Sequence, residues 1–225
     1  MDLHKIITSY FPKIISENLT LIQIGANDGL QSDPFRQSII DYKIDSYLLE
    51  PIPEFYNMLQ NNYSNYKWVN CFNLAITTKN GDQEIEYVPK INGLPEWTQG
   101  LGTFDSTKNF LGEGKGGNGL NIDYSKTELY EEVKKNIKKI TVKTNTLETF
   151  LSNQNINKID LYLSDTEGFD WVIFNQLDLE KYSPKVIFME THTLGEEQNS
   201  LIDEKLIKYG YTILDKTWDT IAIKN

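Results

Sequence analysis

Four side chains capable of acid–base chemistry follow two apolar segments in the second half of the chain. Asp165 and Glu167 come directly after one apolar run, and Glu190 and His192 end the next. In open α/β sheets, ligands bind beyond the carboxyl ends of the strands, so the four side chains would share one edge of a sheet. A histidine at a strand end in a cleft is a candidate general base near neutral pH. The pattern predicts a catalytic site at this edge.

The same residues also have ordinary structural explanations. Asp165 or Thr166 could cap a helix that begins after Gly168, and His192 could be a solvated loop residue. Helix capping explains one of the two acids, Asp165 or Glu167, and explains both less well. Two carboxylates one residue apart are costly to bury unless a cation, a hydrogen-bond donor or water stabilises their charge. The four residues could also hold a divalent metal. Their spacing is not diagnostic of a metal site, so we predict no metal and favour acid–base chemistry.

A glycine turn near the start of the chain predicts a binding loop. An apolar run ends at Gly25, and Gly29 follows four residues later, before a helix-compatible segment. A strand that turns through glycines into a helix brings backbone N–H groups close to a ligand, although glycine also serves ordinary turns that need a positive φ. Asn27 and Asp28 would repel a pyrophosphate but suit a sulfonium and an amino group. This favours S-adenosylmethionine over a dinucleotide.

An acid about twenty residues after this turn strengthens the interpretation. A second apolar run ends in Glu50-Pro51. At this spacing, a carboxylate could bind the two hydroxyls of a ribose. The two features together predict a cofactor that contains a nucleoside.

The elements that must position these residues alternate between strand and helix patterns. We expect an amphipathic helix at 3–10, strands at 19–24, 46–49, 68–76, 83–89, 140–144, 159–163 and 186–189, and helices at 34–41, 53–62, 127–138, 146–151, 169–177 and 196–209. The strands at 211–214 and 220–223 are too close for a parallel crossover and must pair antiparallel. The alternation predicts an α/β fold with a mostly parallel sheet and helices on both faces.

A stretch rich in glycine and asparagine, at about 90–124, interrupts the alternation. A structureless insert of this length is usually a functional lid or a disordered segment. Trp97, Phe104 and Phe110 favour a lid. A disordered surface excursion is the alternative.

Composition sets the remaining limits. The chain has 225 residues, a formal net charge of −10 and one cysteine. This length suits a single domain over residues 1–225, and the negative charge argues against a nucleic-acid partner. No apolar run approaches the ~20 residues that span a bilayer, and we expect no signal peptide. Cys71 favours an inert buried thiol, and the cytoplasm is the simplest compartment.

At its motifs the sequence resembles the FkbM-type methyltransferase family. The similar segments are Ile24–Gly29, Leu49–Pro53, Asn73–Ile76, Thr146–Phe150, Ile159–Leu161, Asp165–Gly168 and Val186–Glu190. They occur in the family's order over about residues 19–192. The order of elements also resembles class I S-adenosylmethionine-dependent methyltransferases. This resemblance implies a Rossmann-like, mostly parallel seven-stranded sheet with an antiparallel C-terminal hairpin.

The resemblance also implies O-methyl transfer to a hydroxyl of a sugar, glycolipid or small natural product. By matching position, the methionine part would lie on Gly25, Ala26, Asn27, Asp28 and Gly29, the ribose on Glu50 beside Pro51, the adenine on Asn73, Leu74 and Ala75, and the methyl group near Asp165 and Glu167. His192 or Asp165 would be the base, with Glu167 or Glu190 orienting the acceptor.

Two departures and two other functions stay open. Gln23 stands where the family often has an acid, and Leu163 where a lysine is common. The chain could instead be a non-catalytic module that binds S-adenosylmethionine or sugar, or a nucleotide-sugar oxidoreductase. The closing hairpin and the acidic loop oppose the oxidoreductase. The oligomeric state is left open by the sequence.

Overall fold

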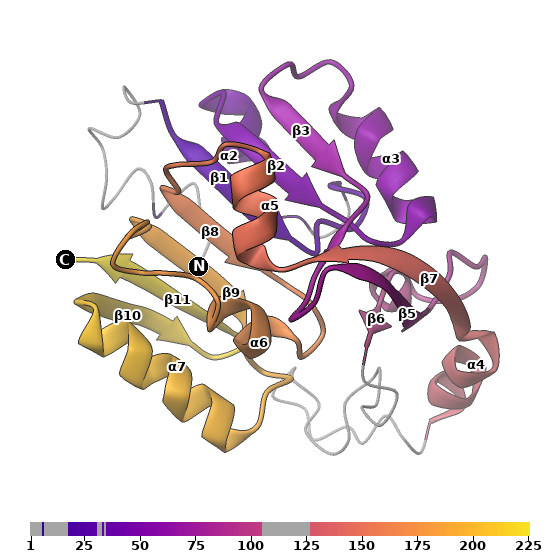
Figure 1. Ribbon diagram of the computed structural model, residues 1–225. Helices are drawn as coiled ribbons and strands as arrows, with labels where there is room; N and C mark the ends of the chain where they lie inside the picture. Colours follow the sequence, from indigo (N-terminus) through magenta and orange to yellow (C-terminus); the bar gives the residue numbers. More distant parts are fainter. Residues whose placement is uncertain (1–5, 7–17, 31–32, 34, 105–126) are drawn as a thin grey trace.

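A computed structural model describes residues 6, 18–30, 33, 35–104 and 127–225, which form two β-sheets with their helices (Figure 1). The predicted N-terminal helix at 3–10 lies outside the described residues except for Ile6, which is helical and fully buried.

The larger sheet has seven strands. Its order is β10-β11-β9-β8-β1-β2-β3, and only β11 runs antiparallel to its neighbours. The strands are β1 (Thr20–Ile24), β2 (Asp45–Leu49), β3 (Val69–Phe72), β8 (Leu161–Ser164), β9 (Val186–Glu190), β10 (Tyr211–Lys216) and β11 (Asp219–Lys224). The link between β10 and β11 is too short for a parallel crossover. The arrangement confirms the predicted class I methyltransferase-like fold.

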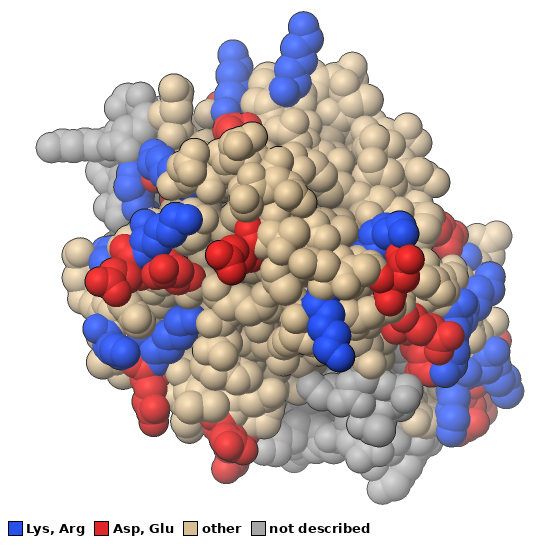
Figure 2. Space-filling view, viewed as in Figure 1, with Lys and Arg blue, Asp and Glu red and all other residues tan. Residues whose placement is uncertain are grey.

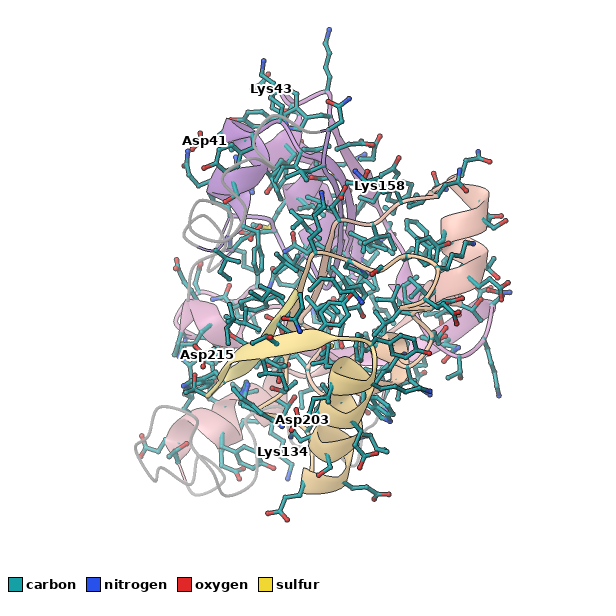
Figure 3. The ribbon with its side chains drawn as sticks, turned by 90° about the vertical axis from the view of Figure 1, so that its left-hand side faces the viewer. Asp41, Lys43, Lys134, Lys158, Asp203 and Asp215 are labelled. Atoms are coloured by element: carbon teal, nitrogen blue, oxygen red, sulfur yellow. The ribbon has the colours of Figure 1, made fainter. Side chains whose placement is uncertain are left out.

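Helices cover both faces of this sheet, as predicted. One face carries α2 (Arg36–Asp41) and α3 (Pro53–Tyr63), and the other carries α5 (Leu147–Asn153), α6 (Asp170–Phe174) and α7 (Glu196–Lys208). Successive strand residues enter opposite cores, so that Leu21 clusters with Ile39 of α2 and Ile22 with Phe150 of α5. In the side view of Figure 3, α2, which carries Asp41, and α5 lie on opposite sides of the sheet. Because both faces are covered, apolar residues predominate in the central strands.

The smaller sheet differs from two predictions, the single strand at 68–76 and the structureless stretch at 90–124. It has the order β4-β7-β5-β6, with β4 (Ala75–Ile76), β5 (Gly81–Tyr87), β6 (Gly102–Thr103) and β7 (Lys138–Asn145), and it is flanked by α4 (Glu128–Asn136) and the 3-10 helix η2 (Glu96–Thr98). The predicted single strand at 68–76 is wrong, because the chain leaves the larger sheet after Phe72 and enters the smaller one at Ala75. Between them, the Asn73 amide donates to the carbonyl oxygens of Glu50 at 2.9 Å and Pro51 at 2.8 Å, which holds the bend.

The second correction concerns the glycine-rich stretch. Residues 90–104 are not structureless, since η2 and β6 lie within them. The backbone of Val88 pairs with Leu101 and with Gly100 at 2.9 Å, which folds this segment back on the smaller sheet. Phe110 and residues 105–124 of the predicted insert lie outside the described part of the chain.

The described helices and one face of the molecule bear on possible membrane and nucleic-acid contacts. Within the described residues, every helix is too short or too polar to cross a bilayer. On the face in Figure 2, positive and negative side chains are interspersed. Charged side chains pair across the β5–β7 ladder, where Lys139 lies 2.8 Å from Glu86 and Lys143 lies 2.6 Å from Asp82. Such exposed pairs contribute little to stability.

Lys205 of α7 joins two helices on one face of the larger sheet. Its ammonium group donates to the carbonyl oxygens of Phe174, Asn175 and Leu177 at 2.8, 3.1 and 3.0 Å, at the end of α6. We expect Lys205→Met to lower the free energy of unfolding by about 1.5–3 kcal/mol, because these carbonyl groups lose a charged donor. Urea denaturation measures the change. Lys208→Met removes the same charge from an exposed site on α7, and an equal loss there would contradict this explanation.

Candidate active site

A cavity of about 290 Å³ lies beyond the carboxyl ends of β2, β1 and β8. One end is apolar and is formed by Ile52, Leu74, Ala75, Ile76 and Ile85. Because Ile85 belongs to β5, the smaller sheet supplies part of this wall. The other end is polar and contains residues from both the β1 and the β8 regions. A single space therefore joins an apolar slot to a set of acids.

Glycine is required at position 25 because the backbone of Asp165 lies too close for a side chain. Gly25 also lines the cavity. Its φ is +83°, and a Cβ atom placed there would lie 1.8 Å from the carbonyl oxygen of Asp165. The N–H groups of Gly25 and Ala26 both donate to the carbonyl of Leu49, at 3.0 and 2.9 Å. Gly25 and Ala26 line the cavity as predicted. The glycine lets the ends of β1, β2 and β8 meet.

Asp28 and Gly29 lie outside the cavity lining, unlike the residues before them. Asp28 is buried, and its Oδ1 accepts from the N–H of Leu30 at 2.9 Å. A Cβ atom on Gly29, whose φ is +64°, would lie 2.4 Å from Cδ1 of Leu59 on α3. These contacts give both residues a role in shaping the loop.

Glu50 lines the cavity with both carboxylate oxygens engaged. Oε2 accepts from the N–H of Asn27 at 2.9 Å, and Oε1 accepts from the N–H of Ile52 at 2.8 Å. Burial raises the pKa of Glu50 to about 7, against these two hydrogen bonds, and the charges of Asp165 and Asp28 raise it further. Each carboxylate oxygen can accept more than one hydrogen bond, so Glu50 keeps the capacity to bind hydroxyl groups.

Asn27 connects the glycine turn to the smaller sheet. Its φ is +46°, a conformation that asparagine tolerates better than most residues. Its side-chain amide donates to the carbonyl of Gln99 at 3.2 Å, and Gly100 packs so closely that a Cβ atom would lie 2.4 Å from the Asn27 amide nitrogen. The loop that was predicted to bind the cofactor therefore also anchors residues 99–100.

The predicted adenine residues divide into two groups. Leu74 and Ala75 line the apolar slot together with Pro51 at its edge, whereas Asn73 lies outside the lining. The Asn73 side chain instead holds the backbone of the Glu50-Pro51 segment. Its contribution to the cavity is indirect.

Three of the four predicted catalytic residues come together. Carboxylate oxygens of Asp165, Glu167 and Glu190 all lie within 4.8 Å of one another. The N–H of Glu167 donates to Oε2 of Glu190 at 3.1 Å, and Glu167 has a φ of +53°, a strained value for glutamate. Asp165 and Glu167 line the cavity, and Glu190 lies behind them. Oxygen atoms at these separations could also ligate a hard divalent cation, the alternative that the sequence left open.

The local hydrogen bonds exclude the capping explanation. The N-cap residue of α6 is Phe169, and no side chain makes a capping hydrogen bond there. The N–H of Thr166 donates to Oδ2 of Asp170 instead, at 3.2 Å. Neither Asp165 nor Thr166 caps this helix, so its start does not account for the acid that faces the cavity.

The acids of this cluster hold protons more tightly than free carboxyls do. Asp165 is exposed to the cavity, yet protein surrounds it, and burial raises its pKa to about 7, with further contributions from Asp170, Asp219 and Asp33. Burial followed by the neighbouring acids raises the pKa of Glu167 and of Glu190 well above the ordinary value. A carboxyl with a pKa near neutrality is suited to acid–base work.

His192 lies outside the cavity lining. Its Nδ1 is 3.4 Å from Oε1 of Glu190, and its ring packs on Trp218 with centroids 4.6 Å apart. Burial lowers the pKa of His192. In this position the histidine contacts Glu190 and is separated from the space where an acceptor would bind.

The structure adds cavity residues that sequence reasoning missed. They are Gln23, Asp33, Ile85, Trp97, Phe104, Phe169 and Asp219. Trp97 and Phe104 were predicted only as part of a lid, and Gln23 only as a departure from the family pattern. Asp33 and Asp219 carried no signal, because each is an isolated acid in a loop or at a strand start. Burial raises the pKa of Cys71 to about 11, which suits the predicted inert thiol.

A search of the curated proteins found no significant match. Among solved structures, the chain is similar to a precorrin-6y C5,15-methyltransferase from Geobacter metallireducens GS-15, with a TM-score of 0.44 and 12% sequence identity, over 92% of this chain and 80% of that chain. The sequence family described as "Methyltransferase FkbM domain" matches residues 23–213. Because this match spans most of the sequence, including β2, β8 and β9, the chain belongs to the FkbM methyltransferase family.

Proposed function

We propose that this chain is a single-domain, S-adenosylmethionine-dependent O-methyltransferase that acts on a hydroxyl of a sugar or small natural product. The continuous cavity carries the proposal. It places an apolar slot, the Glu50 carboxylate and the Asp165–Glu167 acids in one space. A methyl donor that contains a nucleoside and a sulfonium needs all of these features within one cavity.

The residues of the cavity fit such a donor. The slot formed by Ile52, Leu74, Ala75, Ile76 and Ile85 has the apolar character that an adenine ring requires. Glu50 stands at the end of β2, where a carboxylate can accept from ribose hydroxyls. The acids near Gly25 suit a positively charged sulfonium, and the electrophilic methyl group of that sulfonium is the chemistry that the donor supplies.

The chain's own residues then align the acceptor and remove its proton. Asp165 would accept the proton of the acceptor hydroxyl, whose oxygen would take the methyl group that the bound donor supplies as its sulfur leaves. Alignment of this kind can contribute ~7–11 kcal/mol to lowering the barrier. Glu167 orients the acceptor from the same cavity wall, and Glu190 holds Glu167 through its backbone N–H. Asp165 is preferred over His192 as the base because Asp165 lines the cavity and His192 does not.

The rest of the lining favours an uncharged acceptor. Trp97, Phe104 and Phe169 line the cavity, with the Phe104 and Phe169 ring centroids 5.7 Å apart, and Trp97 is 47% exposed. Aromatic faces bind the apolar faces of sugar rings and of polycyclic natural products. Among the described residues that line the cavity there is no lysine or arginine. Nothing there would neutralise a phosphate or a carboxylate on the acceptor.

Two measurements test the proposal. Calorimetry with S-adenosylhomocysteine should give saturable binding, and incubation of a cell extract with labelled S-adenosylmethionine should place the label on a hydroxyl compound. Binding without any transfer across a panel of glycans and natural products would favour the non-catalytic module. Absorbance changes with a nicotinamide cofactor would favour the oxidoreductase.

Glu50 provides a direct test of donor binding. We expect Glu50→Gln to weaken the affinity for S-adenosylhomocysteine about 10- to 100-fold, because hydrogen bonds to a charged group contribute ~1.5–3 kcal/mol. Titration calorimetry measures the affinity. Glu54→Gln removes the same charge from an exposed site in the first turn of α3 and should leave binding unchanged. Unchanged binding in Glu50→Gln would remove this residue from the ribose site.

A further inference from the structure

We propose that Asp170 is a positioning residue for methyl transfer, which fixes the backbone between Asp165 and Glu167 and keeps the Asp165 carboxyl basic through its own negative charge. The inference rests on the proposed function, in which Asp165 takes the proton of the acceptor hydroxyl. Asp170 begins α6, is fully buried and is absent from the cavity lining. It would therefore act through its neighbours and touch neither donor nor acceptor.

The segment that carries the two cavity acids is held through its backbone. The N–H of Asp165 donates to the carbonyl at the end of β1 at 3.0 Å. The N–H of Thr166 donates to Oδ2 of Asp170 at 3.2 Å, and that of Glu167 donates to Oε2 of Glu190 at 3.1 Å. Three consecutive N–H groups are thus bound to β1, α6 and β9. Asp170 holds the middle one, which belongs to the peptide group that joins Asp165 to Thr166.

This hydrogen bond alone does not explain a carboxylate at position 170. The amide oxygen of an asparagine could accept from the same Thr166 N–H, and it would avoid the cost of burying a charge. The other carboxylate oxygen of Asp170, Oδ1, is buried and has no hydrogen-bond partner among the described residues. The charge of Asp170 is therefore better explained by its effect on a neighbouring group.

The neighbouring group is the carboxyl of Asp165. Burial, followed by the charge of Asp170, raises the pKa of Asp165 to about 7. Burial also raises the pKa of Asp170, but the polar groups of Ser164 and Thr166 beside it lower it. Two buried carboxyls close together do not readily carry a charge at the same time. The proton of the pair therefore stays on Asp165, and the negative charge stays on Asp170.

Other ionisable groups surround Asp165. They come from the segment before α2, from β2, from the same loop, from β9 and from β11, and they are Asp33, Glu50, Glu167, Glu190 and Asp219, with His192 next to Glu190. The described lining of the cavity contains no lysine or arginine that would offset them. Because Asp170 lies outside this lining, its charge can be removed without loss of a contact to donor or acceptor.

Asp170→Asn separates the charge from the hydrogen bond. The asparagine keeps the shape of the side chain and an acceptor for the Thr166 N–H. We expect the rising limb of kcat/KM against pH to move about one pH unit lower, because Asp165 then loses its proton more readily. The affinity for S-adenosylhomocysteine should stay within about twofold in calorimetry. Asp178→Asn removes the same charge from an exposed site shortly after α6 and should leave the limb in place.

Carbon-13 NMR follows the same titration without turnover. In protein labelled at its aspartate carboxyl groups, the signal of Asp165 is the one that Asp165→Asn removes. This signal should titrate near pH 7 in the unsubstituted protein. In Asp170→Asn it should titrate about one pH unit lower.

The outcomes separate this inference from the proposed function. If the unsubstituted protein transfers no methyl group, the proposed function fails, and the NMR titration still decides whether Asp170 sets the proton affinity of Asp165. An unchanged limb and an unchanged titration of Asp165 in folded Asp170→Asn would overturn the inference. A lower kcat without either shift would show that residue 170 is only structural. If Asp170→Asn does not fold, Asp170→Ser removes the charge and keeps an acceptor at the start of α6, and the same shift is expected.

Discussion

Gly25→Ala is expected to prevent the chain from folding. The added Cβ atom would lie 1.8 Å from the Asp165 carbonyl oxygen, and the backbone would have to hold a φ of +83° with a side chain present. That carbonyl belongs to backbone at the end of β8, so it cannot move aside without breaking the hydrogen bond from the N–H of Asp165 to the carbonyl of Ile24. We expect a loss of more than about 4 kcal/mol, which is exceptional for one substitution. Circular dichroism and urea denaturation measure it.

Gly93→Ala is the matched control for this effect. Gly93 also has a positive φ, +101°, but a Cβ atom there would meet nothing within 4 Å. Its substitution carries only the backbone strain, about 1–3 kcal/mol. Similar stability losses at Gly25 and Gly93 would show that backbone strain, rather than the contact with Asp165, makes glycine necessary at position 25.

Asp165→Asn is expected to lower turnover about 10²- to 10⁴-fold while leaving the affinity for S-adenosylhomocysteine nearly unchanged. The substitution keeps the shape of the side chain but removes its ability to accept a proton, and a general base contributes a factor of this size. Labelled methyl transfer at saturating donor measures turnover, and calorimetry measures binding. His192→Ala should retain most of the turnover, because His192 lies outside the cavity lining.

The dependence of kcat/KM on pH is a second test of Asp165 as the general base. Burial raises the pKa of Asp165 to about 7. A base works only after it has lost its proton, so kcat/KM should rise as the pH increases through about 7 and then level off. Asp165→Asn should lose this rising limb. A limb that persists in Asp165→Asn and disappears in His192→Ala would transfer the role to the histidine.

The sequence predicted the larger sheet because its signals are local. Each central strand is an apolar run that ends at a glycine or an acid, and the hairpin at 211–223 leaves only one way to pair. The smaller sheet was harder to predict. Nothing in residues 68–76 marks the place where one strand ends and another begins, since the bend depends on the distant contact between Asn73 and the Glu50-Pro51 backbone.

The candidate site was predictable where it follows strand ends, and less so elsewhere. Glu50, Asp165 and Glu167 line the cavity because strand ends share one edge of the sheet. His192 follows the end of β9, yet the chain turns it onto Trp218, which the sequence does not reveal. Asp33 and Ile85 enter the cavity through loop and sheet contacts across long sequence separations. Only tertiary structure brings them there.

The hydrogen bond between Asn27 and Gln99 ties together regions that are far apart along the chain. One wall of the cavity comes from the larger sheet, and part of the opposite wall comes from β5 and residues 96–104. A molecule seated between them would contact both and would be released only if one wall moved. Occupancy should therefore slow amide exchange in residues 96–104, and it should make the two sheets melt together as a single cooperative unit.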